Sequence, residues 1–192
     1  QLDEVFMSLK NKDLIKTTLT DKYSLNDKNF FYILSLPQHA EQGYIDWSNH
    51  INQIEEIFKT IEKTNCNFLI SIHPRQDKSR YLYLQEKYNC KFIDESLSSI
   101  IGISDVFISS NSTTAIWATL CGIPVLNIKG PTKNLFPYLD TVFYVDSIDN
   151  IGLQLKSIME NDALDFSNDW IKLSRDKIFD GKFLERFINL IS

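Results

Sequence analysis

The chain lacks the features that mark several large classes of protein. Its 192 residues include only three cysteines, six glycines and five prolines, and no apolar run approaches the roughly 20 residues of a membrane-spanning helix. No secretory signal is recognisable at the N-terminus. Lysine and arginine are scattered and the formal net charge is -5, which argues against a nucleic acid as partner. The composition is that of one large globular domain.

Motifs for metals and common cofactors are missing too. Cys66, Cys90 and Cys121 form no C-x-x-C pair and do not cluster with histidine, so no metal site is expected. We expect buried free thiols, as in a reducing cytoplasm. The chain has no G-x-G-x-x-G fingerprint, no Walker A loop and no G-x-S-x-G elbow. These absences argue against NAD enzymes, P-loop NTPases and common esterases.

What is present is an alternation of apolar runs with amphipathic helical stripes. Runs typical of strands buried on both faces lie at 30–36, 67–72, 92–93, 106–108, 123–128 and 142–145. Helical stripes follow them, and two more are expected around 166–173 and 183–191. The pattern predicts an α/β fold with a doubly wound, mostly parallel, Rossmann-like sheet.

The same pattern suggests how the chain is divided. Residues 1–29 are expected to be an N-terminal segment or linker with one or two helical turns, and residues 30–192 to be the Rossmann-like domain. The helix after the first strand is expected to begin at Ser48 as N-cap, with His50 exposed on its first turn.

The stretch Asp105–Leu126 is the most informative one. It predicts a strand, a polar turn, a short helix ending at Gly122, and another strand. The six polar side chains of Ser109–Thr114 need water or a ligand. Backbone N–H groups at a helix start favour anions, and Ser112, Thr113 and Thr114 add hydroxyl donors. The turn therefore predicts a phosphate site shaped by Ser110 and Asn111; an ordinary N-cap, which needs one hydroxyl, is the alternative.

In a doubly wound sheet the ligand binds outside the carboxyl ends of the strands. Four loops are expected at this edge: 37–44, 73–77, 109–114 and 129–134. His73 ends a strand and is followed by Pro74, which fixes the exit of the chain, and by Arg75. An imidazole can donate to a phosphate oxygen and a guanidinium can add a fork of donors. The alternatives are a histidine held by the backbone and a solvated arginine.

Weaker candidates lie on the other two loops. His39 and Glu41 could act as acid or base, and Lys129 and Lys133 could face a negative ligand. The alternative is an exposed polar loop, which is the simpler explanation for His39 and Glu41 and an equal one for Lys129 and Lys133.

Taken together, three motifs resemble the carboxyl-terminal nucleotide-binding domain of GT-B fold proteins. These are the strand leading to His73-Pro74, the sequence Ser-Asp-Val-Phe-Ile-Ser-Ser-Asn-Ser-Thr-Thr-Ala from Ser104, and Cys-Gly-Ile-Pro-Val-Leu from Cys121. The Gly-containing ending, Asp180 to Ile188, is similar to the closing helix of that superfamily. The resemblance covers about residues 30 to 190 and includes surface-polysaccharide glycosyltransferases and hydrolysing UDP-N-acetylglucosamine 2-epimerases.

The resemblance implies a nucleotide-sugar donor, linked to CMP, CDP or UDP, and no cofactor or metal. His73 matches the histidine of the His-Pro motif in sialyl-, polysialyl- and Kdo-type transferases, where it contacts the nucleotide phosphate. Ser112, Thr113 and Thr114 match the hydroxyl-rich phosphate motif. The chain would be one half of a cytoplasmic enzyme, inactive alone. The other half would supply the acceptor contacts and the base, for a saccharide or lipid-linked acceptor, with peripheral membrane association of the whole enzyme.

Two departures favour a transferase over an epimerase. The ribose-binding glutamate of epimerases and many UDP-sugar transferases would fall at Ile116 or Trp117, and the paired glycines of epimerases at Ser112 and Thr113 or their neighbours. An epimerase-like enzyme is the second hypothesis. The third is a small α/β binding or regulatory module without enzyme activity.

Overall fold

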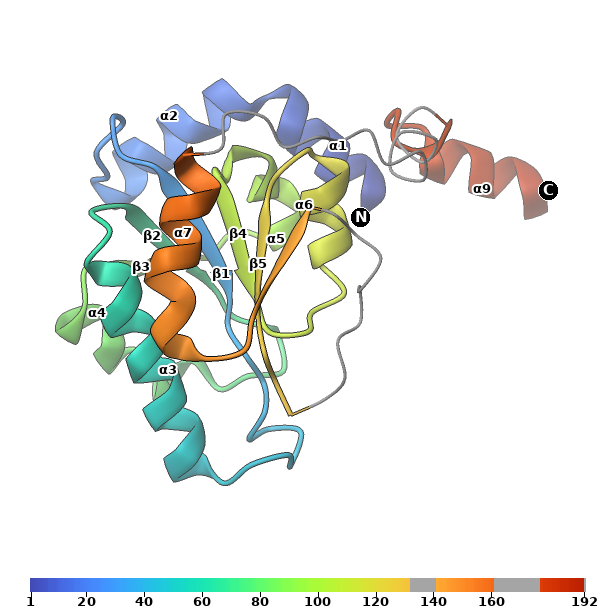
Figure 1. Ribbon diagram of the computed structural model, residues 1–192. Helices are drawn as coiled ribbons and strands as arrows, with labels where there is room; N and C mark the ends of the chain where they lie inside the picture. The colour runs from blue at the N-terminus through green and yellow to red at the C-terminus, as the bar shows by residue number, and fades with distance from the viewer. Residues whose placement is uncertain (132–140, 161–176, 192) are drawn as a thin grey trace.

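The centre of the molecule is a six-stranded, all-parallel sheet (Figure 1). The structure is a computed structural model that describes residues 1–131, 141–160 and 177–191. The strand order is β3-β2-β1-β4-β5-β6. The strands are β1 (Phe31–Ser35), β2 (Asn67–Ser71), β3 (Cys90–Phe92), β4 (Val106–Ser109), β5 (Val125–Ile128) and β6 (Val142–Val145). The predicted doubly wound α/β fold is therefore confirmed. The order reverses between β1 and β4, which is where such sheets bind ligands.

Helices cover both faces of the sheet. One face carries α3 (Trp47–Glu62), η1 (Lys78–Arg80), α4 (Tyr83–Lys87), η3 (Ile148–Asn150) and α7 (Ile151–Glu160). The other carries α1 (Leu2–Lys10), α2 (Lys12–Tyr23), α5 (Leu97–Ile100), η2 (Ile101–Ile103) and α6 (Ala115–Leu120). Alternate residues of β1 serve the two cores: Tyr32 and Leu34 belong to the first, and Phe31 and Ile33 to the second. This explains why the strand is apolar at every position.

The N-terminal segment is more helical than the expected one or two turns. It forms α1 and α2, because its apolar residues recur at helical spacing over more than two turns. Val5 and Leu19 are buried in the second core. The backbone of α1 lies so close to η2 that a Cβ on Gly102 would come within 2.6 Å of Leu9 Cα.

The start of α3 corrects two expectations. The N-cap is Asp46 rather than Ser48, because the Asp46 carboxylate accepts a 2.9 Å hydrogen bond from the backbone N–H of Asn49. The helix then begins at Trp47, and position 50 falls one turn before the buried Ile54. His50 is accordingly fully buried, not exposed as expected.

The C-terminal helix α9 (Phe183–Ile191) confirms the predicted stripe there and extends away from the sheet (Figure 1). Asp3 of α1 caps it, accepting from the backbone N–H groups of Phe183 at 2.8 Å and Leu184 at 2.9 Å. The helix expected around 166–173 lies outside the described residues. Within the described part of the chain, no helix is both long enough and apolar enough to cross a membrane.

Candidate functional site

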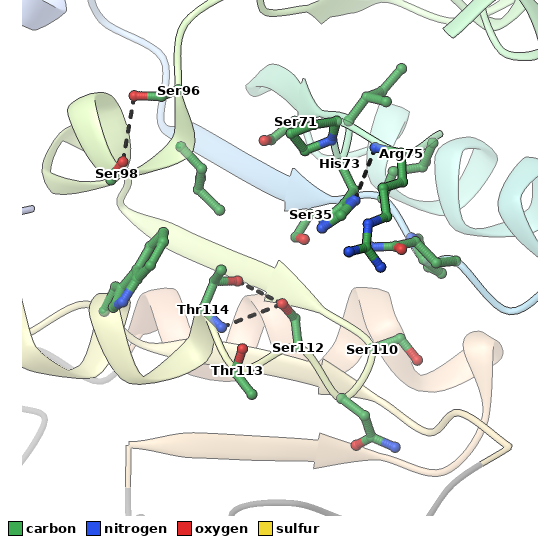
Figure 2. Close-up of a pocket in the computed structure, with 18 of the residues that line it drawn as sticks. Ser35, Ser71, His73, Arg75, Ser96, Ser98, Ser110, Ser112, Thr113 and Thr114 are labelled. Atoms are coloured by element: carbon green, nitrogen blue, oxygen red, sulfur yellow. Dashed lines mark hydrogen bonds between the residues drawn. The ribbon is translucent and has the colours of Figure 1, made fainter. Parts of the chain in front are cut away.

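A cleft of about 870 Å³ opens at the carboxyl ends of the central strands. The loops after β1, β2, β3 and β4 all line it. Figure 2 shows Ser112, Thr113 and Thr114 on one side, across from Ser35, Ser71, His73 and Arg75. The sheet thus brings together the residues that the sequence placed on separate loops. These are His39, His73, Pro74, Arg75, Ser110, Asn111, Ser112, Thr113 and Thr114.

The turn after β4 is stabilised by hydrogen bonds within it and by hydrogen bonds to Asn127 of β5. The Ser112 and Thr114 hydroxyls lie 2.7 Å apart, and Asn111 takes a left-handed backbone conformation with φ of 54°. The amide of Asn127, buried in β5, accepts from the Ser109 hydroxyl at 3.1 Å and from the Asn111 N–H at 2.9 Å. Its Nδ2 donates to Asn111 Oδ1 at 3.0 Å. Asn127 therefore fixes the floor of the turn.

This turn leaves hydrogen-bond donors available. The backbone N–H groups of Ser112 and Thr113 make no hydrogen bond to any described residue. The helix that follows, α6, is only six residues long, so the local N–H groups and hydroxyls matter more than any helix dipole. The sequence analysis did not identify Asn127 as the residue that supports the turn. The available signal was a single amide side chain inside the apolar run Ile123–Ile128.

The loop after β2 presents His73 in a defined tautomer. Its Nδ1 accepts a 3.1 Å hydrogen bond from the backbone N–H of Arg75, so the ring proton of the neutral side chain resides on Nε2. No described residue bonds Nε2, which leaves a donor for a ligand in the cleft. Gln76 stabilises the loop, accepting from the His73 N–H at 3.0 Å and donating to Pro37 O at 2.9 Å. The exposed Arg75 side chain lies beside His73 (Figure 2).

Two serines at the floor of the cleft were not among the predicted site residues. Ser35 and Ser71 are the last residues of β1 and β2 and pair in the sheet. Both line the cleft, where their small side chains leave room and offer hydroxyls. The available signal was a serine near the end of each apolar run, before Pro37 and before His73-Pro74.

The loop after β1 separates the two predicted acid–base candidates. His39 lines the cleft, and its Nε2 lies 3.1 Å from the Ser110 hydroxyl. Burial, aided by the nearby His50 ring, lowers the pKa of His39 from its ordinary value, so the ring is neutral at pH 7.

Glu41 does not line the cleft and belongs to a hydrogen-bonded group beside it. Its Oε1 accepts from the Tyr81 hydroxyl at 2.6 Å and from Gln76 Nε2 at 3.0 Å. Burial alone raises the pKa of Glu41, but these hydrogen bonds outweigh it and lower the pKa. His50 lies behind the same group, with its Nε2 3.0 Å from the Tyr81 hydroxyl.

Lys129 lies apart from the cleft. Its Nζ is 3.4 Å from Asp146 Oδ1, and it lines a neighbouring, smaller pocket. Lys133 falls outside the described residues. Among the residues that the structure describes, no group of three or more His, Cys, Asp or Glu side chains could hold a metal ion. The cleft combines neutral donors with His73 and Arg75, an arrangement suited to an anionic ligand.

Solved structures of glycosyltransferases share the fold of this chain, although no sequence comparison finds a match. No protein-family model and no curated protein sequence matches the chain. Among solved structures, a histidine-to-alanine variant of the wall teichoic acid polymerase TagF is similar over 99% of this chain and 49% of its own, with 13% identity and a TM-score of 0.62. The glycosyltransferase SnogD from Streptomyces nogalater is similar over 86% of this chain and 43% of its own, with 12% identity and a TM-score of 0.58.

A second TagF variant, soaked with CDPG, matches over 99% of this chain and 47% of its own, with 13% identity and a TM-score of 0.55. The chain therefore spans about half the length of the structures it matches. At these identities the likeness establishes the fold alone, which is glycosyltransferase-like.

Proposed function

We propose that this chain is the donor-binding domain of a GT-B type glycosyltransferase and that its cleft holds a nucleotide sugar. The observation that carries the proposal is the convergence of His73 with Ser112, Thr113 and Thr114 on one cleft of a glycosyltransferase-like fold. The two loops are about 40 residues apart in sequence, and only the parallel sheet brings them together.

The available donors suit the phosphates of a departing nucleotide. The leaving group gains negative charge as its bond to the sugar breaks, so donors fixed at that place lower the barrier. We assign this role to His73 Nε2, the N–H groups of Ser112 and Thr113, the Thr113 hydroxyl, and whichever of the Ser112 and Thr114 hydroxyls does not donate to the other. The exposed Arg75 adds a cation at the edge of the cleft. The proposal requires no cofactor.

The binding of the acceptor requires a domain other than this one. The matched structures are about twice as long, so we propose that a second domain supplies the acceptor contacts and the catalytic base. Within this chain His39 is better placed than Glu41 to exchange a proton, because only His39 lines the cleft. We propose a saccharide or lipid-linked acceptor and a role in bacterial surface polysaccharide or glycolipid synthesis at the inner face of the membrane.

Isothermal titration with CMP, CDP, UDP and GDP tests the proposal. We expect one of them to bind, and His73→Ala or the double substitution Ser112→Ala/Thr113→Ala to weaken it by ~10- to 150-fold, the loss of a charge-assisted contact worth ~1.5–3 kcal/mol. Thr60→Ala, a partly buried threonine on α3 outside the cleft, is the matched control and should leave the affinity unchanged.

Indifference to all four nucleotides, both in this chain and in a longer protein that contains it, would refute the proposal and favour a binding module. Conversion of UDP-N-acetylglucosamine to its 2-epimer would favour the epimerase hypothesis instead.

A further inference from the structure

A second pocket of about 290 Å³ adjoins the cleft. The two share Pro37, His39 and Ser110, so the His39–Ser110 pair forms the wall between them. The second pocket lies between α3 and the carboxyl ends of β5 and β6. A water molecule takes roughly 30 Å³ in the liquid, so this pocket has room for on the order of ten non-hydrogen atoms.

Among the residues that line this pocket is a histidine with a buried ring nitrogen that lacks a partner among the described residues. His50 is fully buried, and its Nδ1 has no hydrogen-bond partner among the described residues. The Tyr81 hydroxyl donates to Glu41, so it accepts from His50 through Nε2–H. Nδ1 is therefore a lone-pair acceptor that calls for a donor such as a hydroxyl.

The other lining groups are neutral or already paired. His39, Gln53, Ser110 and Ser147 offer uncharged donors and acceptors, while Lys129 is paired with Asp146. An anion would find no unpaired cation among these groups. The lining residues include no Phe, Tyr or Trp on which a planar base could stack. Ile54, Ile57, Ile128 and Ile148 supply aliphatic surface for C–H groups.

Uncharged hydrogen-bonding groups around an aliphatic wall match one class of ligand. We infer that the second pocket binds a compact polyhydroxylated group, a sugar ring or a polyol. The inference rests on the proposed function in one respect: the group is the one carried by the nucleotide whose phosphates occupy the cleft. The scissile bond then lies next to the His39–Ser110 pair, at the junction of the two pockets.

The test compares nucleotides with and without the polyhydroxylated group. Titrations of CDP against CDP-glycerol, and of UDP against UDP-N-acetylglucosamine, give for each pair the ratio by which the conjugate binds more tightly. Gln53→Leu and Ser147→Ala, both at exposed positions that line the pocket, should each lower that ratio about fivefold, the loss of one hydrogen bond. The affinity for CDP or UDP alone should stay within about twofold. Asn52→Leu, exposed on α3 beside Gln53 but not in the pocket, should leave the ratio unchanged.

The inference is overturned if the wild-type ratio is one, or if both variants leave it unchanged. It is also overturned if the affinity for CDP or UDP falls as much as that of the conjugate. If no nucleotide binds, the proposed function fails, and the pocket is tested alone by NMR with glycerol and methyl glucoside. Saturable shifts of the Gln53 side-chain amide signals, identified by their loss in Gln53→Leu, would support the pocket. Unmoved signals would refute it.

Discussion

Replacing Asn127 by leucine should remove the support of the β4 turn and with it the anion site. The Asn127 side chain is 1% exposed and makes three hydrogen bonds, to the Ser109 hydroxyl, the Asn111 N–H and Asn111 Oδ1. Leucine fills a similar volume but makes none of them. Asn111 would also lose the contacts that hold it at a positive φ, so the turn should relax.

The magnitude follows from those three bonds. Each contributes about 1 kcal/mol net, and the buried Ser109 hydroxyl would lose its acceptor, so we expect a loss of ~2–4 kcal/mol in the free energy of unfolding. For a domain of this size that lowers the Tm by roughly 5–15 °C. Nucleotide affinity should fall at least ~10-fold, because shifts of about 1 Å in positioned groups are costly.

A matched control exists at the amino ends of the strands, on the opposite side of the sheet from the cleft. Asn67, at the start of β2, is 6% exposed and also makes three hydrogen bonds, accepting from the Asn26 N–H and donating to Asn26 O and Asn29 O. Asn67→Leu should lower the Tm by a similar amount and leave nucleotide affinity intact. Thermal unfolding measures the Tm of both variants, and calorimetric titration measures their nucleotide affinity. Equal affinities in the two variants would refute the positioning role of Asn127.

Further predictions concern stability. Burial lowers the pKa of His50 from its ordinary 6.5, so the unfolded chain takes up the proton first and stability is lost as pH falls below 6.5. We expect the Tm to fall between pH 7.5 and 5, and His50→Gln to remove part of that fall; an unchanged pH profile would contradict this. Gly102→Ala should displace α1 and lower the Tm sharply, with faster proteolysis of α1, because the new Cβ meets the Leu9 backbone. Gly152→Ala in α7, where a Cβ meets only Thr60 Cγ2 at 3.9 Å, should instead raise the free energy of unfolding by about 0.5–1 kcal/mol. A lower Tm for Gly152→Ala would contradict this prediction.

The sheet could be predicted from the sequence because its signal is local. Most of the strands are largely apolar runs, and Val142–Val145 has the predicted bounds. The exception is β3, which includes Lys91 and spans Cys90–Phe92 where the run 92–93 was predicted. Loops that end such strands must share one edge of a parallel sheet, so His73 and Thr113 could be placed near each other without coordinates. Whether these residues bind a nucleotide stays a prediction, because fold likeness at 12–13% identity does not reach side-chain roles.

The burial of His50, the role of Asn127 and the second pocket could not be predicted, because they depend on contacts between distant segments. The predicted exposure of His50 was wrong because residue 50 lies one turn before Ile54, on the buried face of α3, and the distant Tyr81 supplies a hydrogen-bond partner for the buried ring. The role of Asn127 is defined by a neighbouring strand, and the second pocket by three elements at once. Neither leaves a periodic signal along the chain.

The acidic residues of the cleft show how a chain of net charge -5 can offer an anion site. Asp94 and Glu95, after β3, line the cleft and would repel a phosphate if left unpaired. Lys78 lies 2.7 Å from Asp94, and its hydrogen bond lowers the pKa of that carboxyl.

The partners of Glu95 come from the N-terminal segment. Lys22 lies 2.6 Å from Glu95 Oε1, and the Tyr23 hydroxyl donates to Oε2 at 2.8 Å. Burial alone raises the pKa of Glu95, but these contacts lower it, so the carboxylate stays ionised and paired. Helix α2, whose sequence carried no sign of chemistry, therefore shapes the electrostatics of the cleft. Because the Lys22 pair is partly exposed, salt weakens this shielding, and anion affinity should depend on ionic strength through α2 as well as through Arg75.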